Sequence, residues 1–434
     1  MRAGRPLRQR LVRGEERDNV LYQRMGQPDR STGADRVIRC DHPSAILLPK
    51  GSDMRLIHTS DWQVGKAFRF ADDATRAVLR DERLEVISRI GRLAEEHSVS
   101  AVLVAGDTYD VTAPSDRTLR QPLERMRQFP ALRWHLIPGN HDPHVPSGPW
   151  ERLVRLGLPD NVVVHLTPEP APLGDGIAWV VPSVLTRRHA VGDPTEGMET
   201  VPTPEGAIRI GLAHGSLTSF GSEPAATHNL IAFERAERAG LSYLALGDWH
   251  GAQVMGSRAA YSGTPERDGF DLGGRGGGEV LLVEVHGRGA VPSVTFLSTG
   301  RFAWRRETAT LDGDDAVAVL EARLRGLGPD LSQLLVQLSV SGTLSLNGRD
   351  LFERTIRGGV GSAVRALRID DTELRLQPSA ADLATLVRAG VAGVAAERLR
   401  GLAGDPAHPQ RDVARAALQR LYLLHVRHHE GSAA

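Results

Sequence analysis

The residues that decide the fold are AVLVAGDTYD at positions 101–110 and WHLIPGNHD at positions 134–142. In each stretch a run of mostly apolar residues leads to a glycine, and a residue that can bind a metal follows directly. An unbroken apolar run such as Ala101–Ala105 is typical of a parallel strand that is buried on both faces. Because open α/β sheets bind ligands at the carboxyl ends of their strands, we predict an α/β fold with a functional site at that edge.

Strands and helices alternate from Met54 onward. Leu56–Thr59 is a short strand that ends just before Asp61, and Thr75–His97 has its apolar residues at helical spacing. The other elements expected in this part are strands at Val162–His165, Ile177–Val181, Ile208–Ala213 and Tyr243–Leu246, a helix near Ile231–Ala239, and a closing hairpin of Val280–Val285 and Val291–Leu297.

A second pattern begins after Arg305. Its expected elements are a helix at Ala316–Leu327, a strand at Leu334–Val340, a helix at Leu351–Arg357 and a strand at Ala366–Leu376. We therefore expect a main domain at residues 54–304, a small α+β domain at residues 305–378 and a helical segment at residues 379–434. The last helix, Arg411–His425, is amphipathic, and it either packs on its own domain or docks a partner.

Residues 1–53 differ from the rest of the chain. Arginines are scattered among Gly, Asp and Gln without the period of a helix or a strand, and such a segment buries too little apolar surface to offset its ordering entropy. Two interpretations stay open: a disordered basic arm, or translated sequence ahead of a true start at Met54. The second is favoured because Met54 opens directly into the first strand.

The bulk composition excludes some classes of protein. Of the 434 residues, 41% are hydrophobic and 24% are charged, as in ordinary globular proteins. No apolar run approaches the roughly 18 residues of a membrane span, and no stretch has the order of a secretory signal, so we expect a cytoplasmic protein. The only cysteine, Cys40, rules out an internal disulfide. The net charge of zero does not point to nucleic acid, although a local basic groove remains compatible with it.

Metal-competent side chains follow almost every expected strand of the main domain. They are Asp61, Gln63, Asp107, Asn140, His141, His214, Asp248 and His250. A single Gly-Asp pair is usually a turn, and a lone histidine is usually structural, but five such strand ends in chain order indicate a common site. Carboxylate, amide and imidazole ligands together suit Mn²⁺ or a similar divalent ion. Asp107, central in the order, is placed to bridge two ions about 3.5–4 Å apart, as in two-metal phosphoesterases.

Five segments carry a resemblance to a known family. HTSDWQVGK (58–66), VAGDTYD (104–110), PGNHD (138–142), LAHGS (212–216) and LALGDWH (244–250) resemble, in order, the motifs of the calcineurin-like metallophosphoesterase superfamily. The chain looks most like the SbcD-type DNA repair exonucleases, because of HTSDW with the following Gly65-Lys66 and because of YSGTPE at 261–266. The resemblance spans about Met54 to Phe302.

The resemblance implies a four-layered β-sandwich flanked by helices, followed by a small α+β capping domain. It implies hydrolysis of DNA, exonucleolytic and also endonucleolytic, with two Mn²⁺ ions. It further implies an SMC-like coiled-coil ATPase of the SbcC type as partner, and it leaves a homodimer open. The implied roles are as follows: Asp61, Asp107 and His250 hold the first metal, Asp107, Asn140 and His214 hold the second, and His141 is the catalytic acid.

Two positions depart from the family pattern. Gln63 and Asp248 stand where the motifs have histidines. Aspartate remains a good ligand, so we expect Asp248 to hold the second metal, whereas Gln63 offers the first metal only an amide oxygen. We expect an active nuclease. The alternatives are a phosphoesterase that acts on nucleotides or other small phosphodiesters, and a catalytically weakened subunit that binds DNA ends.

Overall fold

The structure is a computed structural model that describes residues 37–38, 53–110, 113–173, 176–218, 228–272, 275–377 and 390–430. The interpretation of residues 1–53 therefore falls almost wholly outside the described residues, as does Cys40. Only the short strand β1 (Val37–Ile38) and Asp53 belong to that segment and are described.

Two mixed sheets form the main domain. The larger sheet has the order β1-β15-β14-β2-β3-β4-β5, with β15 at Ser293–Ser298, β14 at Glu279–Val285, β2 at Met54–Thr59, β3 at Ala101–Val104, β4 at Arg133–Leu136 and β5 at Val162–Val164. The smaller sheet has the order β12-β13-β11-β8-β7-β6, with β12 at Gln253–Met255, β13 at Ala259–Tyr261, β11 at Tyr243–Gly247, β8 at Ile208–His214, β7 at Ala178–Pro182 and β6 at Ala171–Leu173. Each sheet contains a set of strands that pair in parallel, so the carboxyl ends within a set lie at the same edge. These sets are β2, β3, β4 and β5 in the larger sheet and β7, β8, β11 and β13 in the smaller one.

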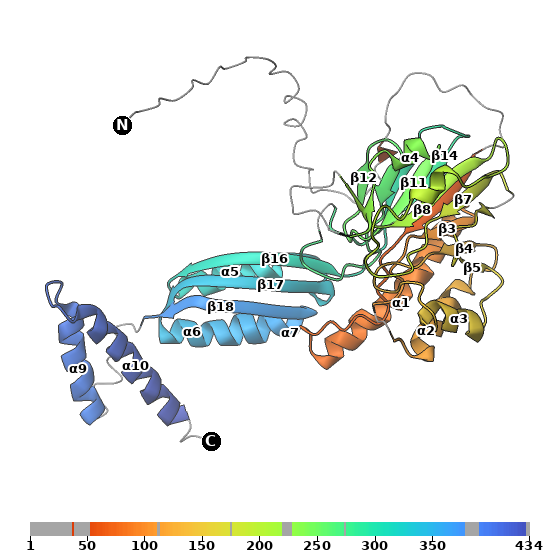
Figure 1. The fold of residues 1–434 in the computed structure, drawn as a ribbon. Helices are drawn as coiled ribbons and strands as arrows, with labels where there is room; N and C mark the ends of the chain where they lie inside the picture. Colours follow the sequence, from red (N-terminus) through yellow and green to blue (C-terminus); the bar gives the residue numbers. More distant parts are fainter. Residues whose placement is uncertain are drawn as a thin grey trace, which may run out of the picture. The chain divides into compact units, whose positions relative to one another are not determined.

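Three apolar cores separate the layers. One core lies between the two sheets, and a second lies between the larger sheet and helices α1 (Asp73–Glu96), α2 (Asp116–Met126) and α3 (Pro149–Leu156), which share one side of the domain (Figure 1). A third core joins the outer face of the smaller sheet to α4 (Arg235–Arg238) and the 3-10 turn Glu196–Glu199. The predicted α/β fold with sheets flanked by helices is confirmed.

The sequence of strand β3 is apolar without interruption because both faces of the strand are buried. Val102 and Val104 belong to the core under the helices, whereas Leu103 and Ala105 belong to the core between the sheets. Successive side chains of a strand point to opposite faces, so a strand covered on both faces needs apolar residues at every position.

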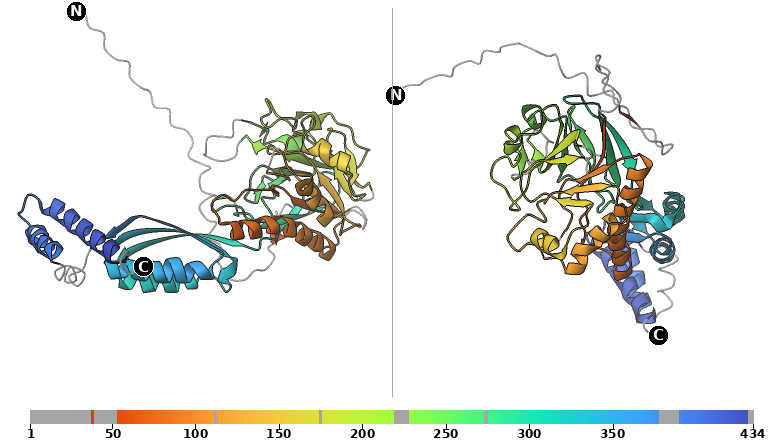
Figure 2. Two further views of the ribbon diagram at one scale, coloured as in Figure 1. Left: turned by 90° about the horizontal axis from the view of Figure 1, so that it is seen from below. Right: turned by 90° about the vertical axis from the view of Figure 1, so that its right-hand side faces the viewer.

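The small domain is built on three parallel strands, β16 (Ala303–Asp312), β17 (Leu334–Leu344) and β18 (Ala366–Leu376). Helix α5 (Asp315–Arg325), helix α6 (Leu346–Phe352), the π-helix Glu353–Val360 and helix α7 (Gly361–Ala363) lie along one face of this sheet (Figures 1 and 2). A 3-10 turn, Leu331–Gln333, precedes β17. Strand β16 was not predicted from the sequence, because charged and hydroxyl residues interrupt its apolar positions.

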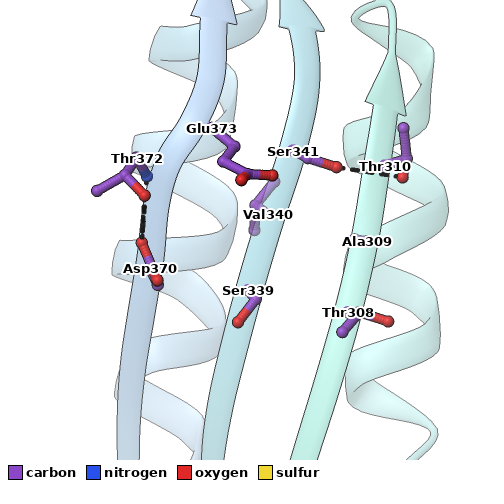
Figure 3. A pocket seen from close by; sticks show the side chains of 9 residues that line it. All are labelled: Thr308, Ala309, Thr310, Ser339, Val340, Ser341, Asp370, Thr372 and Glu373. Carbon is purple, nitrogen blue, oxygen red and sulfur yellow. Dashed lines mark hydrogen bonds between the residues drawn. The ribbon is translucent and has the colours of Figure 1, made fainter. Parts of the chain in front are cut away.

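Part of the face of this sheet opposite its helices is polar, which is uncommon for a parallel sheet. Figure 3 shows hydroxyl and carboxylate side chains that line a shallow pocket on this face, from Thr308 on β16 across Ser339 on β17 to Asp370 on β18. The strand register places these three residues side by side. Near Thr308, Ser339 and Asp370 the sheet therefore has apolar residues on its helix-covered face only. Farther along the same strands, Trp304 and Leu335 are buried in a separate apolar cluster with Phe68, Leu79 and Phe302.

Two helical expectations have different outcomes. The helix expected near Ile231–Ala239 is wrong over its first part, because Leu230–Ile231 forms strand β10, which pairs with β9 (Ser216–Leu217) and buries Ile231; only α4 is helical. The expected C-terminal helices are present as α9 (Val391–Gly404) and α10 (Arg411–Glu430). None of the helices in the described ranges combines the length and hydrophobicity that a bilayer crossing requires.

A histidine buried in β2 makes the stability of the fold sensitive to acid. The Nδ1 atom of His58 lies 2.8 Å from the Tyr243 hydroxyl, and burial lowers the pKa of His58 from 6.5 to about 3. Below about pH 6.5 the His58 ring binds a proton in the unfolded chain but not in the folded chain. The free energy of unfolding therefore decreases as the pH falls below 6.5.

Lowering the pH from 7 to 5 should decrease the free energy of unfolding in the wild type and in His58→Gln by different amounts. We predict that the decrease is on the order of 2 kcal/mol larger in the wild type. Urea unfolding at both pH values measures this difference. His286→Gln, at an exposed histidine, is the control and should behave as the wild type. Equal losses for the wild type and His58→Gln would contradict the prediction.

Candidate metal centre

The predicted site residues come from the strand ends of both sheets. Asp61 and Gln63 follow β2, Asp107 follows β3, Asn140 and His141 follow β4, His214 ends β8, and Asp248 and His250 follow β11. Backbone hydrogen bonds join these turns to one another. The Asp61 N–H donates to the Gly106 carbonyl at 3.1 Å, and the Gly215 N–H donates to the Gly247 carbonyl at 3.1 Å.

Three of the predicted ligands meet in one buried cluster. Asp61, Asp107 and His214 each offer a ligand atom, and these atoms all lie within 4.8 Å of one another. All three side chains are buried, so their charges are poorly screened by water. Two carboxylates and an imidazole at this spacing match the ligand set of a divalent cation.

Buried polar atoms without partners point to the same place. The amide oxygens of Gln63 and Asn140 and the Nε2 atom of His214 are buried and have no hydrogen-bond partner among the described residues. Leaving such a group unsatisfied costs about 1–3 kcal/mol. The amide nitrogens of the same two residues are occupied, since Gln63 donates to Asp107 at 3.0 Å and Asn140 donates to Asp248 at 2.7 Å. The free atoms are those that ligate cations, so the donor set fits divalent metals.

The backbone at these positions adopts conformations that are uncommon for residues with a side chain. The φ angles are 53° at Asp61, 50° at Gln63, 53° at Asp107 and 104° at Asp248. Backbone in this left-handed region costs on the order of 1–3 kcal/mol per residue and collects at functional sites. The turns after β2, β3 and β11 thus store strain at the positions of the predicted ligands.

Asp248 is held in place by two hydrogen bonds. Its carboxylate accepts hydrogen bonds from Asn140 Nδ2 at 2.7 Å and from Ser216 Oγ at 2.6 Å, and it lies 3.7 Å from His214 Nε2. Ser216, which ends the LAHGS segment, was not among the residues predicted from the sequence. Asp248 therefore belongs to the same polar cluster as Asn140 and His214.

His141 lies beside the ligand cluster and has a separate partner. Its Nδ1 atom lies 2.9 Å from Asp110 Oδ1, and its side chain is 35% exposed. The hydrogen bond to Asp110 raises the pKa of His141, and Asp107 adds to the effect. Asp110 was not predicted from the sequence, where its only signal is its place at the end of the VAGDTYD segment.

The electrostatics of the cluster favour a bound cation. Burial raises the pKa of Asp61, although His250 and His214 oppose that rise. Burial lowers the pKa of His214, but Asp107, Asp248 and Asp61 outweigh it and raise the pKa to about 9. The carboxylates therefore favour the protonated form of the histidine, and a divalent cation bound there would displace that proton.

A buried carboxylate shapes the loop that carries Asn140 and His141. Asp142 accepts hydrogen bonds from the backbone N–H groups of Gly139 at 2.7 Å and Tyr109 at 3.0 Å. The loop also approaches Asp107 closely, since the His141 N–H donates to Asp107 Oδ1 at 2.9 Å. Asp142 is completely buried and holds the turns after β3 and β4 together.

Comparison with known proteins finds that part of this chain is similar to phosphoesterases. Residues 54–238 match the family model of calcineurin-like phosphoesterases. The chain is 26% identical over 259 residues to the SbcD subunit of nuclease SbcCD from Escherichia coli strain K12, a match that covers 51% of this chain and 63% of the relative. It is 34% identical over 96 residues to the corresponding SbcCD nuclease subunit of Rhodobacter capsulatus, which covers 21% of this chain and 22% of that relative.

The chain thus spans 63% of the length of the E. coli relative that it matches. Among solved structures, the protein TT1561 of Thermus thermophilus is similar with a TM-score of 0.35 and 13% identity, over 53% of this chain and 93% of that protein. A likeness at that score carries no argument about this chain.

The approach of Gly139 to Asp107 gives a direct test of the centre. A Cβ atom on Gly139 would collide with Asp107 Oδ1 and with the Asp107 backbone nitrogen. We predict that Gly139→Ala displaces Asp107, lowers the free energy of unfolding by about 1–3 kcal/mol and reduces the rise in Tm that Mn²⁺ produces.

Differential scanning calorimetry with EDTA and with Mn²⁺ measures both effects. Gly197→Ala is the matched control, because a Cβ atom there meets nothing within 4 Å. A Gly139→Ala protein with the full metal-induced rise in Tm would exclude Asp107 from the metal centre.

Proposed function

We propose that this chain, which carries a calcineurin-like metallophosphoesterase domain at residues 54–238, hydrolyses phosphodiester bonds of DNA with the help of two divalent metal ions. The observation that carries the proposal is the buried cluster of Asp61, Asp107 and His214, with the unpartnered amide oxygens of Gln63 and Asn140 beside it. DNA as the substrate is supported by the matched relatives, which are named nuclease subunits.

The residues would divide between two metals as the family resemblance implies. Asp61, Gln63, Asp107 and His250 would hold the first ion, and Asp107, Asn140, His214 and Asp248 would hold the second. Divalent ions bound there would make a water molecule nucleophilic at neutral pH and would neutralise the charge that develops on the phosphate oxygens. We propose Mn²⁺, because oxygen ligands outnumber imidazoles in this set.

His141 would act on the leaving group. Asp110 holds its Nδ1 atom at 2.9 Å, so the other ring nitrogen is free to face the substrate. Because the raised pKa favours the protonated ring, His141 can donate a proton to the departing DNA oxygen. Asp110 is then a positioning residue, which fixes the orientation of the ring and the nitrogen that carries the transferable proton.

Gln63 and Asp248 differ from the family pattern, and their contacts support an active site over one that has lost its catalytic activity. Gln63 donates to Asp107 with its nitrogen and turns its oxygen to an unpartnered position, and Asp248 replaces an imidazole with a carboxylate that Asn140 and Ser216 hold in place. Both residues also have positive φ angles, and strained backbone of this kind collects at functional sites. The two substitutions therefore fit an altered ligand shell of a working site.

We further propose that the chain works in DNA repair in the cytoplasm, with an SMC-like coiled-coil ATPase of the SbcC type as partner; a homodimer stays a prediction. The relatives are named as subunits of a complex, which supports a partner. Helices α9 and α10 carry exposed apolar side chains, Val391, Val394, Val413 and Leu424, that suit a docking surface.

We predict that His141→Ala lowers the rate of DNA hydrolysis by a factor of about 10²–10⁴ and leaves Mn²⁺ binding unchanged, since a general acid contributes about this much and is no ligand. The assay compares linear duplex DNA, bis(p-nitrophenyl) phosphate and a cyclic nucleotide with Mn²⁺, and with EDTA. His144→Ala, on the same loop, should stay within a few-fold of the wild type.

Three results are informative in this assay. Hydrolysis of DNA that is lost in His141→Ala supports the proposal. Turnover of the small esters alone would favour a small-molecule phosphodiesterase, and DNA binding without any turnover would favour a non-catalytic subunit.

The role of Asp110 is tested through the leaving group. We predict that Asp110→Asn slows DNA hydrolysis at least tenfold in kcat with little change in KM. It should slow bis(p-nitrophenyl) phosphate hydrolysis far less, because nitrophenolate departs without a proton. Equal losses on both substrates would assign Asp110 a structural role only.

A further inference from the structure

A second buried carboxylate lies behind the site and takes no part in the mechanism above. Asp268 follows the YSGTPE segment, and its side chain is 1% exposed. Three cationic or ionisable groups surround it: Lys66 Nζ lies 2.5 Å away, Arg83 Nη2 lies 3.2 Å away and His250 Nδ1 lies 3.1 Å away.

The contact to His250 settles which nitrogen of that ring faces the metal centre. With Nδ1 directed at Asp268, the Nε2 atom points to the other side and lies 3.9 Å from Asp61 Oδ1. In histidines that ligate metals, the second ring N–H commonly donates a hydrogen bond to a carboxylate. This bond fixes the tautomer and makes the ligating nitrogen more basic. The His250 and Asp268 pair has this geometry.

Asp268 is itself held from two directions. Lys66 comes from the turn after β2, two positions beyond Val64, and Arg83 comes from the middle of α1. Arg83 is almost fully buried and also donates to the Trp62 carbonyl at 3.1 Å and to Thr264 Oγ1 at 2.8 Å. The carboxylate is thus tied to the segment that carries Asp61 and Gln63 as well as to His250.

We propose that Asp268 is the positioning residue for the first metal site: it orients His250 and strengthens it as a ligand, and Lys66 and Arg83 lock Asp268 for that task. The inference rests on the proposed function, since it requires a first metal between Asp61 and His250. It also has a chemical reason in this chain. Gln63 supplies that metal only with a neutral amide oxygen, so the site depends more on the imidazole of His250.

The competing explanation is that Asp268 only neutralises Arg83 and Lys66. The two explanations differ in what Asp268→Asn does to metal binding. If Asp268 acts through His250, we expect the weaker of two Mn²⁺ affinities to fall about 10–100-fold while the tighter one is unchanged. If it only balances charge, the apo-protein loses stability and both affinities stay the same.

The experiment is a double-mutant cycle on the full chain, read out by Mn²⁺ titration with calorimetry and with the electron paramagnetic resonance signal of free Mn²⁺. The variants are Asp268→Asn, His250→Ala and the double variant, each first checked for folding in EDTA. Asp193→Asn is the matched control, because Asp193 pairs with a buried arginine, Arg235, at 2.7 Å and should leave both Mn²⁺ affinities unchanged.

The proposal expects Asp268→Asn to weaken Mn²⁺ binding in the wild-type background and to add nothing in the His250→Ala background. An equal loss in both backgrounds, or none in either, overturns it. If Asp268→Asn does not fold, Asp268→Glu keeps the charge, moves the carboxylate by one methylene and must show the same selective loss. A wild type that binds no Mn²⁺ overturns the proposed function as well, whereas two bound ions with an unaffected Asp268→Asn overturn this inference alone.

Discussion

The arrangement of the site depends on one buried carboxylate, that of Asp107. It accepts hydrogen bonds from Gln63 Nε2 at 3.0 Å and from the His141 N–H at 2.9 Å, and it lies 3.5 Å from His214 Nε2. One side chain therefore contacts the turns after β2 and β4 and the end of β8, which belong to two different sheets. A carboxylate buried this deeply is tolerable only when donors surround it, so the turns must close on it.

That closure explains the glycines and the strain around it. Gly139 packs against the Asp107 side chain with no room for a Cβ atom, and the left-handed backbone at Asp61 and Asp107 turns both carboxylates toward a common point. The two apolar cores on either side of β3 supply the stability that maintains this strain. Packing and chemistry are thus linked at the carboxyl end of a single strand.

The charges around Asp107 form two shells with different tasks. The inner shell contains Asp61, Asp107 and His214, and the charges of its carboxylates outweigh the effect of burial and raise the pKa of the histidine. The outer shell contains Asp110 and Asp268, which contact the Nδ1 atoms of His141 and His250. We propose that these outer carboxylates orient the two imidazoles, and that Gln63 and Asp248 supply oxygen ligands where the family pattern has imidazoles.

The sequence by itself determined which residues could form the site. Asp61, Asp107, Asn140 and His214 were predictable because each follows an apolar run, and parallel strands bring their carboxyl ends to one edge. Only the tertiary structure decided which residues support them. Asp110, Ser216 and Asp268 were missed because their roles are contacts across the fold, such as that of Lys66 with Asp268, 202 positions apart in the chain. Strand β16 was missed for a related reason, since one face is polar and its pairing partner β17 lies beyond a helix. Periodicity records which faces are buried, and it does not record which distant side chains meet.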